Sequence, residues 1–168
     1  MSLAATETPM AVTSPPAAAV EGLCPAELAA WRGLLRVHAS VLKALDAEME
    51  AAHGLPLTSY EVLIQLADAP EQRMRMCDLA DSVLLSRSGM SRLVDRLERD
   101  GLLCRCACSH DARGAFACIT EAGLELLAQA RPTHVAGIRR RFLAQFSEEE
   151  LRLLGQFWDR LVPQPPVV

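Results

Sequence analysis

The stretch of residues 86–113, SRSGMSRLVDRLERDGLLCRCACSHDAR, constrains the fold more than any other part of the chain. Its first half carries apolar residues at positions i, i+3, i+4 and i+7, a spacing that places them on one face of a helix. These residues are Met90, Leu93, Val94 and Leu97. Gly101 then supplies the left-handed residue that commonly ends a helix. The segments LLCRCACS and AFACIT, joined by HDARG, follow as two short strands. We therefore predict an amphipathic helix followed directly by a β-hairpin.

The predicted helix is polar and basic at its start and on the face away from the apolar stripe. Hydroxyl and guanidinium groups there can reach phosphates and base edges in a major groove, and a helix N-terminus favours a phosphate. An arginine at the tip of the hairpin can enter the neighbouring minor groove, where narrow A/T tracts attract it. This is the pattern of a winged helix-turn-helix, and it predicts binding to double-stranded DNA. The predicted DNA contacts are Ser86, Arg87, Ser88, Ser91, Arg92 and Arg113.

The charge of the chain limits how such a protein holds DNA. The 168 residues carry a formal net charge of −4, so any positive surface must be local. Residues 86–113 contain six arginines and four acids, which leaves a net charge of +2 and predicts a small footprint on DNA. Hydrophobic residues make up 51% of the chain but aromatic residues only 4%, a composition that suits long helices better than a β-sandwich.

The order of the remaining segments predicts a mainly α fold with a small β-wing. Residues 1–22 are Pro-rich and without period, and are predicted to be a disordered tail. Residues 23–55 form an N-terminal helix, 56–120 the winged domain, 121–162 the C-terminal helices and 163–168 a short tail. The helices at both ends have more apolar surface than one winged domain can cover. They are therefore predicted to form a dimerisation region in a homodimer.

Capping and turn residues predict where individual elements begin. Residues 58–61 (TSYE) and 147–150 (SEEE) both have the pattern of a capping box, and Thr120 can cap the helix between them. Pro132 is predicted to kink or interrupt that helix. The alternating segment of residues 73–76 (RMRM) is predicted to be a third strand that pairs with the hairpin.

With these pieces in this order, the chain resembles the MarR family of bacterial transcriptional regulators over roughly residues 27–162. The resemblance is carried by LPLTSYEVLIQLADAP, CDLADSVLLSRSGMSRLVDRLERDGLL, the Asp-x-Arg of HDARG, and ITEAGLELL. It implies a homodimer whose first and last two helices interlock, and whose two winged domains read a pseudo-palindrome. It also implies groove-facing roles for Arg87, Ser88, Ser91 and Arg92, a minor-groove role for Arg113, and bracing of the wing by Asp111.

The resemblance further implies a possible site for a small effector. Many members of the family respond to small anionic aromatic compounds, bound in a cleft between the dimer helices and the winged domain. Trp31, His38 and Tyr60 are the candidates to line such a cleft. The alternative is that Trp31 is a core residue, His38 a satisfied helix histidine and Tyr60 a neighbour of a helix cap.

The first wing strand departs from the family, because it carries cysteines where relatives often carry charged residues. Cys104, Cys106 and Cys108 alternate and so share one face of the strand. If the hairpin pairs symmetrically about Asp111, Cys118 lies opposite Cys104, within reach of a cross-strand disulfide. Three interpretations stay open: ordinary strand residues, an oxidation sensor, and a metal site. No C-x-x-C pair is present and C-x-C-x-C spaces thiols too regularly for an obvious tetrahedral cage, so no metal site is predicted.

Several function classes are not expected. The serines lack a positioned His–Asp pair and the chain has no Gly-rich phosphate loop, so neither an enzyme nor a cofactor is predicted. No apolar run approaches the roughly 20 residues that span a bilayer, and the N-terminus lacks the pattern of a signal peptide. We therefore expect a cytoplasmic protein with no membrane partner and mostly reduced cysteines.

The predicted function is a DNA-binding regulator, most simply a repressor that a small ligand releases. Two alternatives remain open. One is a thiol-redox or metal-responsive regulator that senses through the wing cysteines, and the other is a winged helix used only for protein contacts.

Overall fold

The computed structural model describes residues 22–83, 87–107 and 115–161. The chain forms two compact units, Met1–His38 and Ala39–Val168, and the boundary between them falls within the long helix α1 (Pro25–His53). We describe each unit by itself, and the predicted domain boundaries at residues 55 and 120 stay predictions. No helix of the described residues combines the length and the apolar character needed to cross a membrane.

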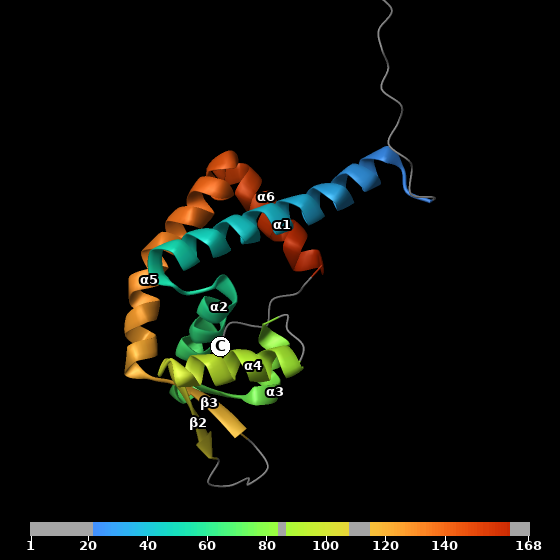
Figure 1. Cartoon of the computed structure of the whole chain (residues 1–168). Helices are drawn as coiled ribbons and strands as arrows, with labels where there is room; N and C mark the ends of the chain where they lie inside the picture. Colours follow the sequence, from blue (N-terminus) through green and yellow to red (C-terminus); the bar gives the residue numbers. More distant parts are fainter. Residues whose placement is uncertain (1–21, 84–86, 108–114, 162–168) are drawn as a thin grey trace, which may run out of the picture. The chain divides into compact units, whose positions relative to one another are not determined.

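Helices dominate the described chain, with one small sheet, as predicted (Figure 1). After α1 the elements are α2 (Leu57–Asp68), the 3-10 turn η1 (Pro70–Gln72), β1 (Arg73–Arg75), α3 (Met76–Ser82), α4 (Arg87–Arg99), β2 (Leu103–Ala107), β3 (Ala115–Ile119), α5 (Glu121–Arg141), the 3-10 turn η2 (Leu143–Gln145) and α6 (Glu148–Leu161).

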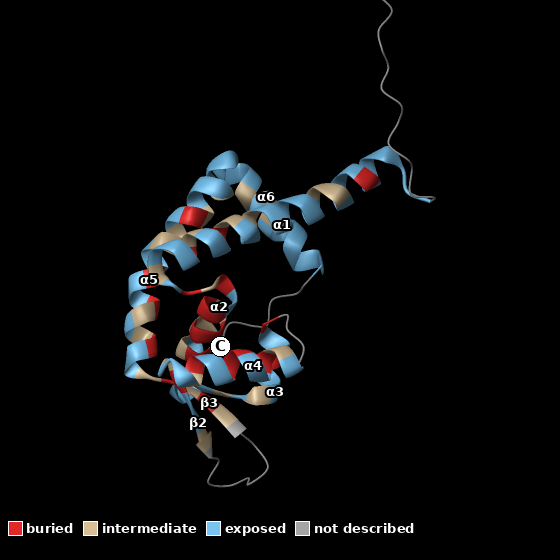
Figure 2. Cartoon of the chain, viewed as in Figure 1, coloured by how far each residue is buried: buried red, intermediate tan, exposed pale blue. Residues whose placement is uncertain are grey.

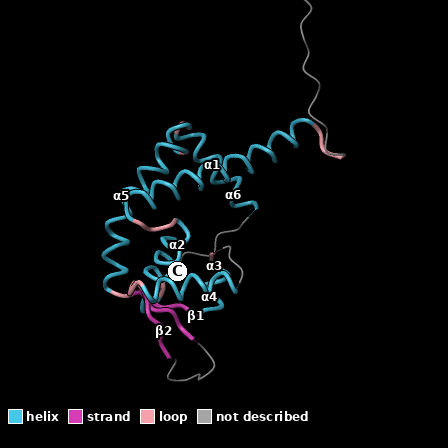
Figure 3. Tube along the Cα trace, in the orientation of Figure 1, coloured by secondary structure: helices cyan, strands magenta, loops and turns pink. Residues whose placement is uncertain are grey.

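The three strands form one antiparallel sheet in the order β1-β3-β2 (Figure 3). β2 and β3 pair as a hairpin with Leu103 opposite Ile119, and β1 pairs with the other edge of β3. The prediction of a third strand at residues 73–76 is therefore confirmed, one residue shorter than expected. The sheet, α3 and α4 together make the helix-turn-helix with its wing.

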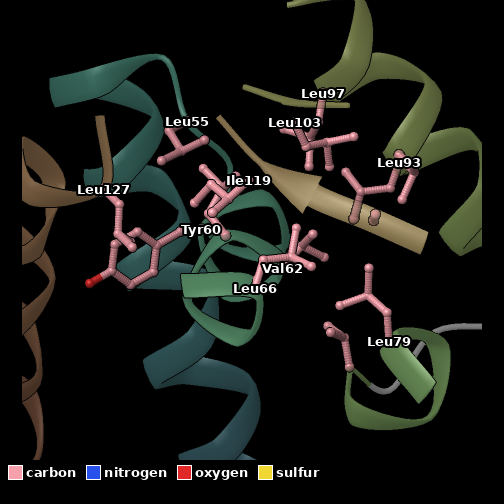
Figure 4. Packing of buried hydrophobic residues seen from close by; sticks show 14 of the residues in the cluster. Leu55, Tyr60, Val62, Leu66, Leu79, Leu93, Leu97, Leu103, Ile119 and Leu127 are labelled. Atoms are coloured by element: carbon pink, nitrogen blue, oxygen red, sulfur yellow. The ribbon is translucent and has the colours of Figure 1, made fainter. Parts of the chain in front are cut away.

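A core of aliphatic side chains joins these elements (Figure 4). α2 supplies its centre, with Val62, Leu63 and Leu66 fully buried. The predicted apolar stripe of α4 packs against it, and all four of its residues, Met90, Leu93, Val94 and Leu97, are buried. In Figure 2 the buried residues follow α2 and the inner face of α4, whereas α6 has none. The core therefore fixes which face of α4 is left for solvent.

The start of α2 differs from the predicted capping box, which is wrong. Thr58 is exposed inside the first turn, and Pro56 occupies the cap position without a side-chain hydrogen bond. The backbone N–H of Leu57 instead donates to Oδ1 of Asp46 on α1 at 2.8 Å. A carboxylate from another element thus satisfies a free N–H of the first turn, and the helix begins earlier than the local sequence indicates.

The junction of α4, β2 and α5 is held by two backbone features. Gly101, at φ +73°, ends α4 as predicted, and the N–H of Leu102 donates to the carbonyl of Leu97 at 2.9 Å. The hydroxyl of Thr120 donates to the carbonyl of Gly101 at 2.7 Å and accepts from the N–H of Gly123 at 3.1 Å. Thr120 is therefore the cap of α5, as predicted, and it also joins that helix to the end of α4.

Two helical glycines give a matched test of this junction. A Cβ on Gly123 would lie 2.2 Å from the carbonyl oxygen of Leu102, whereas a Cβ on Gly155 of α6 meets nothing within 4 Å. We expect Gly123→Ala to lower the free energy of unfolding by about 1–3 kcal/mol, because backbone must shift to admit the methyl group. Gly155→Ala should raise it by up to about 1 kcal/mol through helix propensity. Urea denaturation of both variants measures the difference, and equal effects at the two positions would contradict the close packing at Gly123.

Pro132 was predicted to kink or interrupt this helix, and α5 continues through it without interruption. The helix is anchored on both sides of the proline, because Ala130 is buried in the core and Gly137 packs against Leu45. These contacts offset the lost backbone hydrogen bond. The helix changes direction in mid-course, in keeping with the predicted kink (Figure 1).

The second capping box is confirmed at the start of α6. The N–H of Ser147 donates to Oε2 of Glu150 at 2.8 Å, and the N–H of Glu150 donates to the hydroxyl of Ser147 at 3.4 Å. This pair fixes where the last described helix begins.

Candidate nucleic-acid interface

α4 turns a polar and basic face to solvent, because its apolar stripe is buried on the opposite side. Ser88, Ser91 and Arg92 are exposed on this face. No ion pair joins Arg92 to another of the described residues. Arg87 opens the helix. Its side chain, together with Ser86, Asp111 and Arg113, lies outside what the structure describes, so their predicted roles stay predictions.

The C-terminal end of α4 is fixed to the start of α2. The guanidinium of Arg96 donates from Nη2 to the hydroxyl of Ser59 at 2.9 Å, and Ser59 is buried. The two residues lie 37 positions apart, so this bond sets the orientation of α4 on the body of the domain. A cavity of about 210 Å³ lies beside this Arg96–Ser59 hydrogen bond.

Arg105 of the wing strand β2 is held by acidic residues of α4 and is not free to bind phosphate. Its backbone N–H donates to Oε1 of Glu98 at 3.0 Å, and its guanidinium pairs with both Asp95 and Glu98 of α4. The hydrogen bond with Asp95 raises the pKa of Arg105. Sequence reasoning counted this arginine as positive surface. The signal it missed is a pair of acids at i and i+3 on the helix, followed by a basic residue on the next strand.

The cysteines of the wing gather on one face of the hairpin. Cys104 lies opposite Cys118 in the register, as predicted. The disulfide, however, joins Cys118 to Cys106, across a Cα–Cα distance of 6.5 Å. The reason is that diagonal neighbours on one face of a sheet also lie within disulfide reach. Cys104 keeps an exposed free thiol whose Sγ is 3.8 Å from that of Cys106. Cys108 lies outside the described residues.

The three effector candidates differ in their surroundings. Trp31 and His38 belong to the unit Met1–His38, where both are exposed, Trp31 to 55%. Tyr60 belongs to the other unit and is only 1% exposed, so it is a core residue and not a mere neighbour of a cap. The structure therefore does not bring the three together within one unit.

Tyr60 has two polar neighbours that sequence reasoning missed. Its ring packs on His134 of α5 with the ring centroids 4.5 Å apart. Burial raises the pKa of Tyr60, and a hydrogen bond and charge from Arg131 oppose that shift. Burial also lowers the pKa of His134, which favours the neutral imidazole. The i, i+3 spacing of Arg131 and His134 was the available signal.

Sequence comparison connects the chain to known transcriptional regulators. A family model described as the MarR family matches residues 53–114. The HTH-type transcriptional regulator MhqR of Bacillus subtilis is 35% identical over 109 residues, covering 65% of this chain and 73% of the relative. The homoprotocatechuate degradative operon repressor of Escherichia coli is 27% identical over 110 residues, covering 66% of this chain and 72% of the relative.

Structural comparison agrees with the sequence relatives. Sco3205, a MarR family transcriptional regulator from Streptomyces coelicolor solved in complex with DNA, superposes with a TM-score of 0.79 at 31% identity, covering 87% of this chain and 93% of that one. CouR from Rhodococcus jostii, solved with bound p-coumaroyl-CoA, superposes with a TM-score of 0.68 at 25% identity, covering 80% and 92%. The fold and the order of its elements are thus those of DNA-binding regulators.

Proposed function

The chain belongs to the MarR family of winged-helix transcriptional regulators, and on that premise we propose that it is a homodimeric repressor. In this proposal it binds a pseudo-palindromic operator in the cytoplasm and is released by a small ligand. The observation that carries the proposal is the exposed face of α4, where Ser88, Ser91 and Arg92 lie opposite a fully buried stripe. A helix presented in this way can enter a major groove without unfolding any of the core.

In the proposed complex, the two copies of α4 lie in successive major grooves. Two-fold symmetry then requires half-sites about 34 Å apart, one turn of the double helix. Ser88, Ser91 and Arg92, with Ser86 and Arg87 at the helix start, contact phosphates and base edges. Arg113 reaches the flanking minor groove, and Asp111 braces the wing.

The proposed homodimer would cover exposed apolar surface on the terminal helices. α6 exposes Leu153, Phe157, Trp158 and Leu161, which recur at the spacing of one helix face. Within the unit Met1–His38, α1 exposes Trp31, Leu34, Leu35 and Val37. Large exposed apolar side chains at helical spacing favour association, and a second copy of the chain offers the same surfaces by symmetry. The E. coli relative is named as a repressor, which supports the same role for this chain. A dimer bound to an operator would repress by excluding other proteins from that DNA.

We place the proposed effector next to the junction of α2 and α5. Arg131 supplies a cation for an anionic group, and His134 and Tyr60 supply rings for an aromatic one. Tyr60 is buried and its ring packs on that of His134, so a ligand that displaced the His134 ring would reach Tyr60 and act on α2 in the centre of the winged domain. Trp31 and His38, the other two candidates, belong to the unit Met1–His38, and their predicted roles stay predictions. The bound p-coumaroyl-CoA of CouR supports a ligand-responsive regulator of this kind.

The experiment that tests the function is selection of duplexes from a random-sequence pool, followed by fluorescence anisotropy with the selected site. We expect a two-fold symmetric site whose affinity falls steeply with salt concentration, as phosphate contacts require. A selected site without symmetry would contradict the dimeric operator. Failure to select any site would favour a winged helix used only for protein contacts.

A further inference from the structure

The wing hairpin brings three sulfur atoms together from two strands. The Sγ atoms of Cys104, Cys106 and Cys118 all lie within 4.8 Å of one another, and those of Cys104 and Cys106 are 3.8 Å apart. Thiolates bound to one metal ion at about 2.3 Å necessarily lie about 4 Å from one another. The Sγ atoms of Cys104 and Cys106 already have this separation, and those of Cys106 and Cys118 can adopt it once their disulfide is open.

The donor set indicates which ion. In the part of the chain that the structure describes, this cluster contains thiols and no imidazole or carboxylate ligand. Hard cations prefer oxygen ligands, whereas all-thiolate sites select soft ions such as Cu(I) and Zn(II). A structural zinc site takes four protein ligands, and three are gathered here among the residues that the structure describes. We propose that the reduced wing binds one Cu(I) ion through Cys104, Cys106 and Cys118.

The site requires the Cys106–Cys118 disulfide to be opened first. A dithiol reductant, such as the cytoplasm maintains, supplies two electrons and two protons and is itself oxidised to a disulfide. The sulfur–sulfur bond then becomes two thiols, which join the free thiol of Cys104. Cu(I) binds as the thiols lose their protons to solvent, so the ion keeps its oxidation state throughout.

The proposed metal site is connected to α4, the helix proposed to enter the major groove. Arg105 stands between Cys104 and Cys106 on β2, so its side chain projects from the opposite face of the strand. That side chain pairs with Asp95 and Glu98 of α4. Three thiolates and one Cu(I) carry a net charge of −2 where three neutral thiols carried none. Loading the wing should therefore weaken DNA binding, an effect that rests on the proposed function.

The test is an anaerobic titration of reduced, full-length protein with Cu(I), in competition with a chromogenic Cu(I) chelator. We expect the protein to retain one Cu(I) per chain and to show sulfur-only coordination by X-ray absorption. Cys104→Ser and Cys118→Ser should lose most of this retention. The matched controls are Cys24→Ser and Cys77→Ser, because both replace exposed free thiols outside the cluster and should leave retention unchanged.

Two results would overturn the site. The first is that wild-type protein loses all Cu(I) to the chelator. The second is that a Cys104→Ser/Cys106→Ser/Cys118→Ser variant retains as much Cu(I) as wild type, while its circular dichroism spectrum shows the same fold. Anisotropy with the selected duplex then tests the regulatory effect, where we expect Cu(I) to weaken binding by roughly fivefold to tenfold. The titration uses no DNA, so a failed operator selection overturns the proposed function while the titration still decides the metal site.

Discussion

Replacing Arg92 with alanine is expected to weaken binding to the selected operator by about tenfold to a hundredfold. Arg92 lies on the exposed face of α4, and no described residue holds it in an ion pair. Its guanidinium is therefore available for a base edge, where a bidentate contact is worth about 1–3 kcal/mol of discrimination. Discrimination between the operator and a scrambled duplex should fall with the affinity. Fluorescence anisotropy at fixed salt measures both.

Arg99→Ala is the matched control for this prediction. It removes the same charge from the same helix, but Arg99 stands at the C-terminal end and hydrogen-bonds to the carbonyl of Asp95. We expect only a small loss, equal on specific and scrambled duplexes, because a distant charge acts through the general field. Equal losses for Arg92→Ala and Arg99→Ala would exclude a base contact by Arg92.

Replacing Phe157 with glutamate is expected to dissociate the proposed homodimer. Phe157 is 45% exposed in the single chain and lies on the apolar face of α6. If that face is buried against a second copy, the variant loses an aromatic anchor and leaves a carboxylate without a partner. Central interface residues of this kind cost about 2–4 kcal/mol, so the dissociation constant should rise about thirtyfold to a thousandfold. Analytical ultracentrifugation over a range of concentrations measures the change, and operator affinity should fall with dimer content.

Gln156→Glu provides the comparison for Phe157→Glu. It adds the same charge one residue earlier on α6, at an exposed polar position. We expect it to leave the dimer intact, because it removes no apolar surface. A monomeric Gln156→Glu variant, or a dimeric Phe157→Glu variant, would show that this face of α6 is not the interface.

Local patterns were enough to predict much of the fold. The stripe of α4 follows from 3.6-residue periodicity, since Met90 and Leu97 are both buried as their spacing requires. The caps at Thr120 and Ser147 need only residues within one helical turn. The register of Cys104 opposite Cys118 follows from the symmetry of a short hairpin. In each case the interacting residues are close in sequence.

Where the local pattern was wrong or incomplete, residues distant in the sequence decided the outcome. Thr58 matched a capping box, but Asp46 of α1 satisfies the first turn of α2. Pro132 was predicted to kink or interrupt its helix, and packing on both sides keeps α5 continuous, so that the kink remains without an interruption. Tyr60 was considered for an effector site without its partners, because Arg131 and His134 come from a helix about 70 residues later.

Local patterns in the chain are therefore enough to predict the class of the protein, a mainly helical winged helix-turn-helix in which α4 has one apolar and one basic face. Periodicity and capping are local properties of the chain, and they suffice for that conclusion. Which charges and thiols are available depends instead on how the helices and strands pack together. Pairing with Asp95 and Glu98 removes Arg105 from the positive surface, and the diagonal bond from Cys106 to Cys118 leaves Cys104 as a free thiol among the described residues of the wing. These ion pairs and this disulfide depend on distances of a few ångströms between separate helices and strands, and those distances are set only when the core packs.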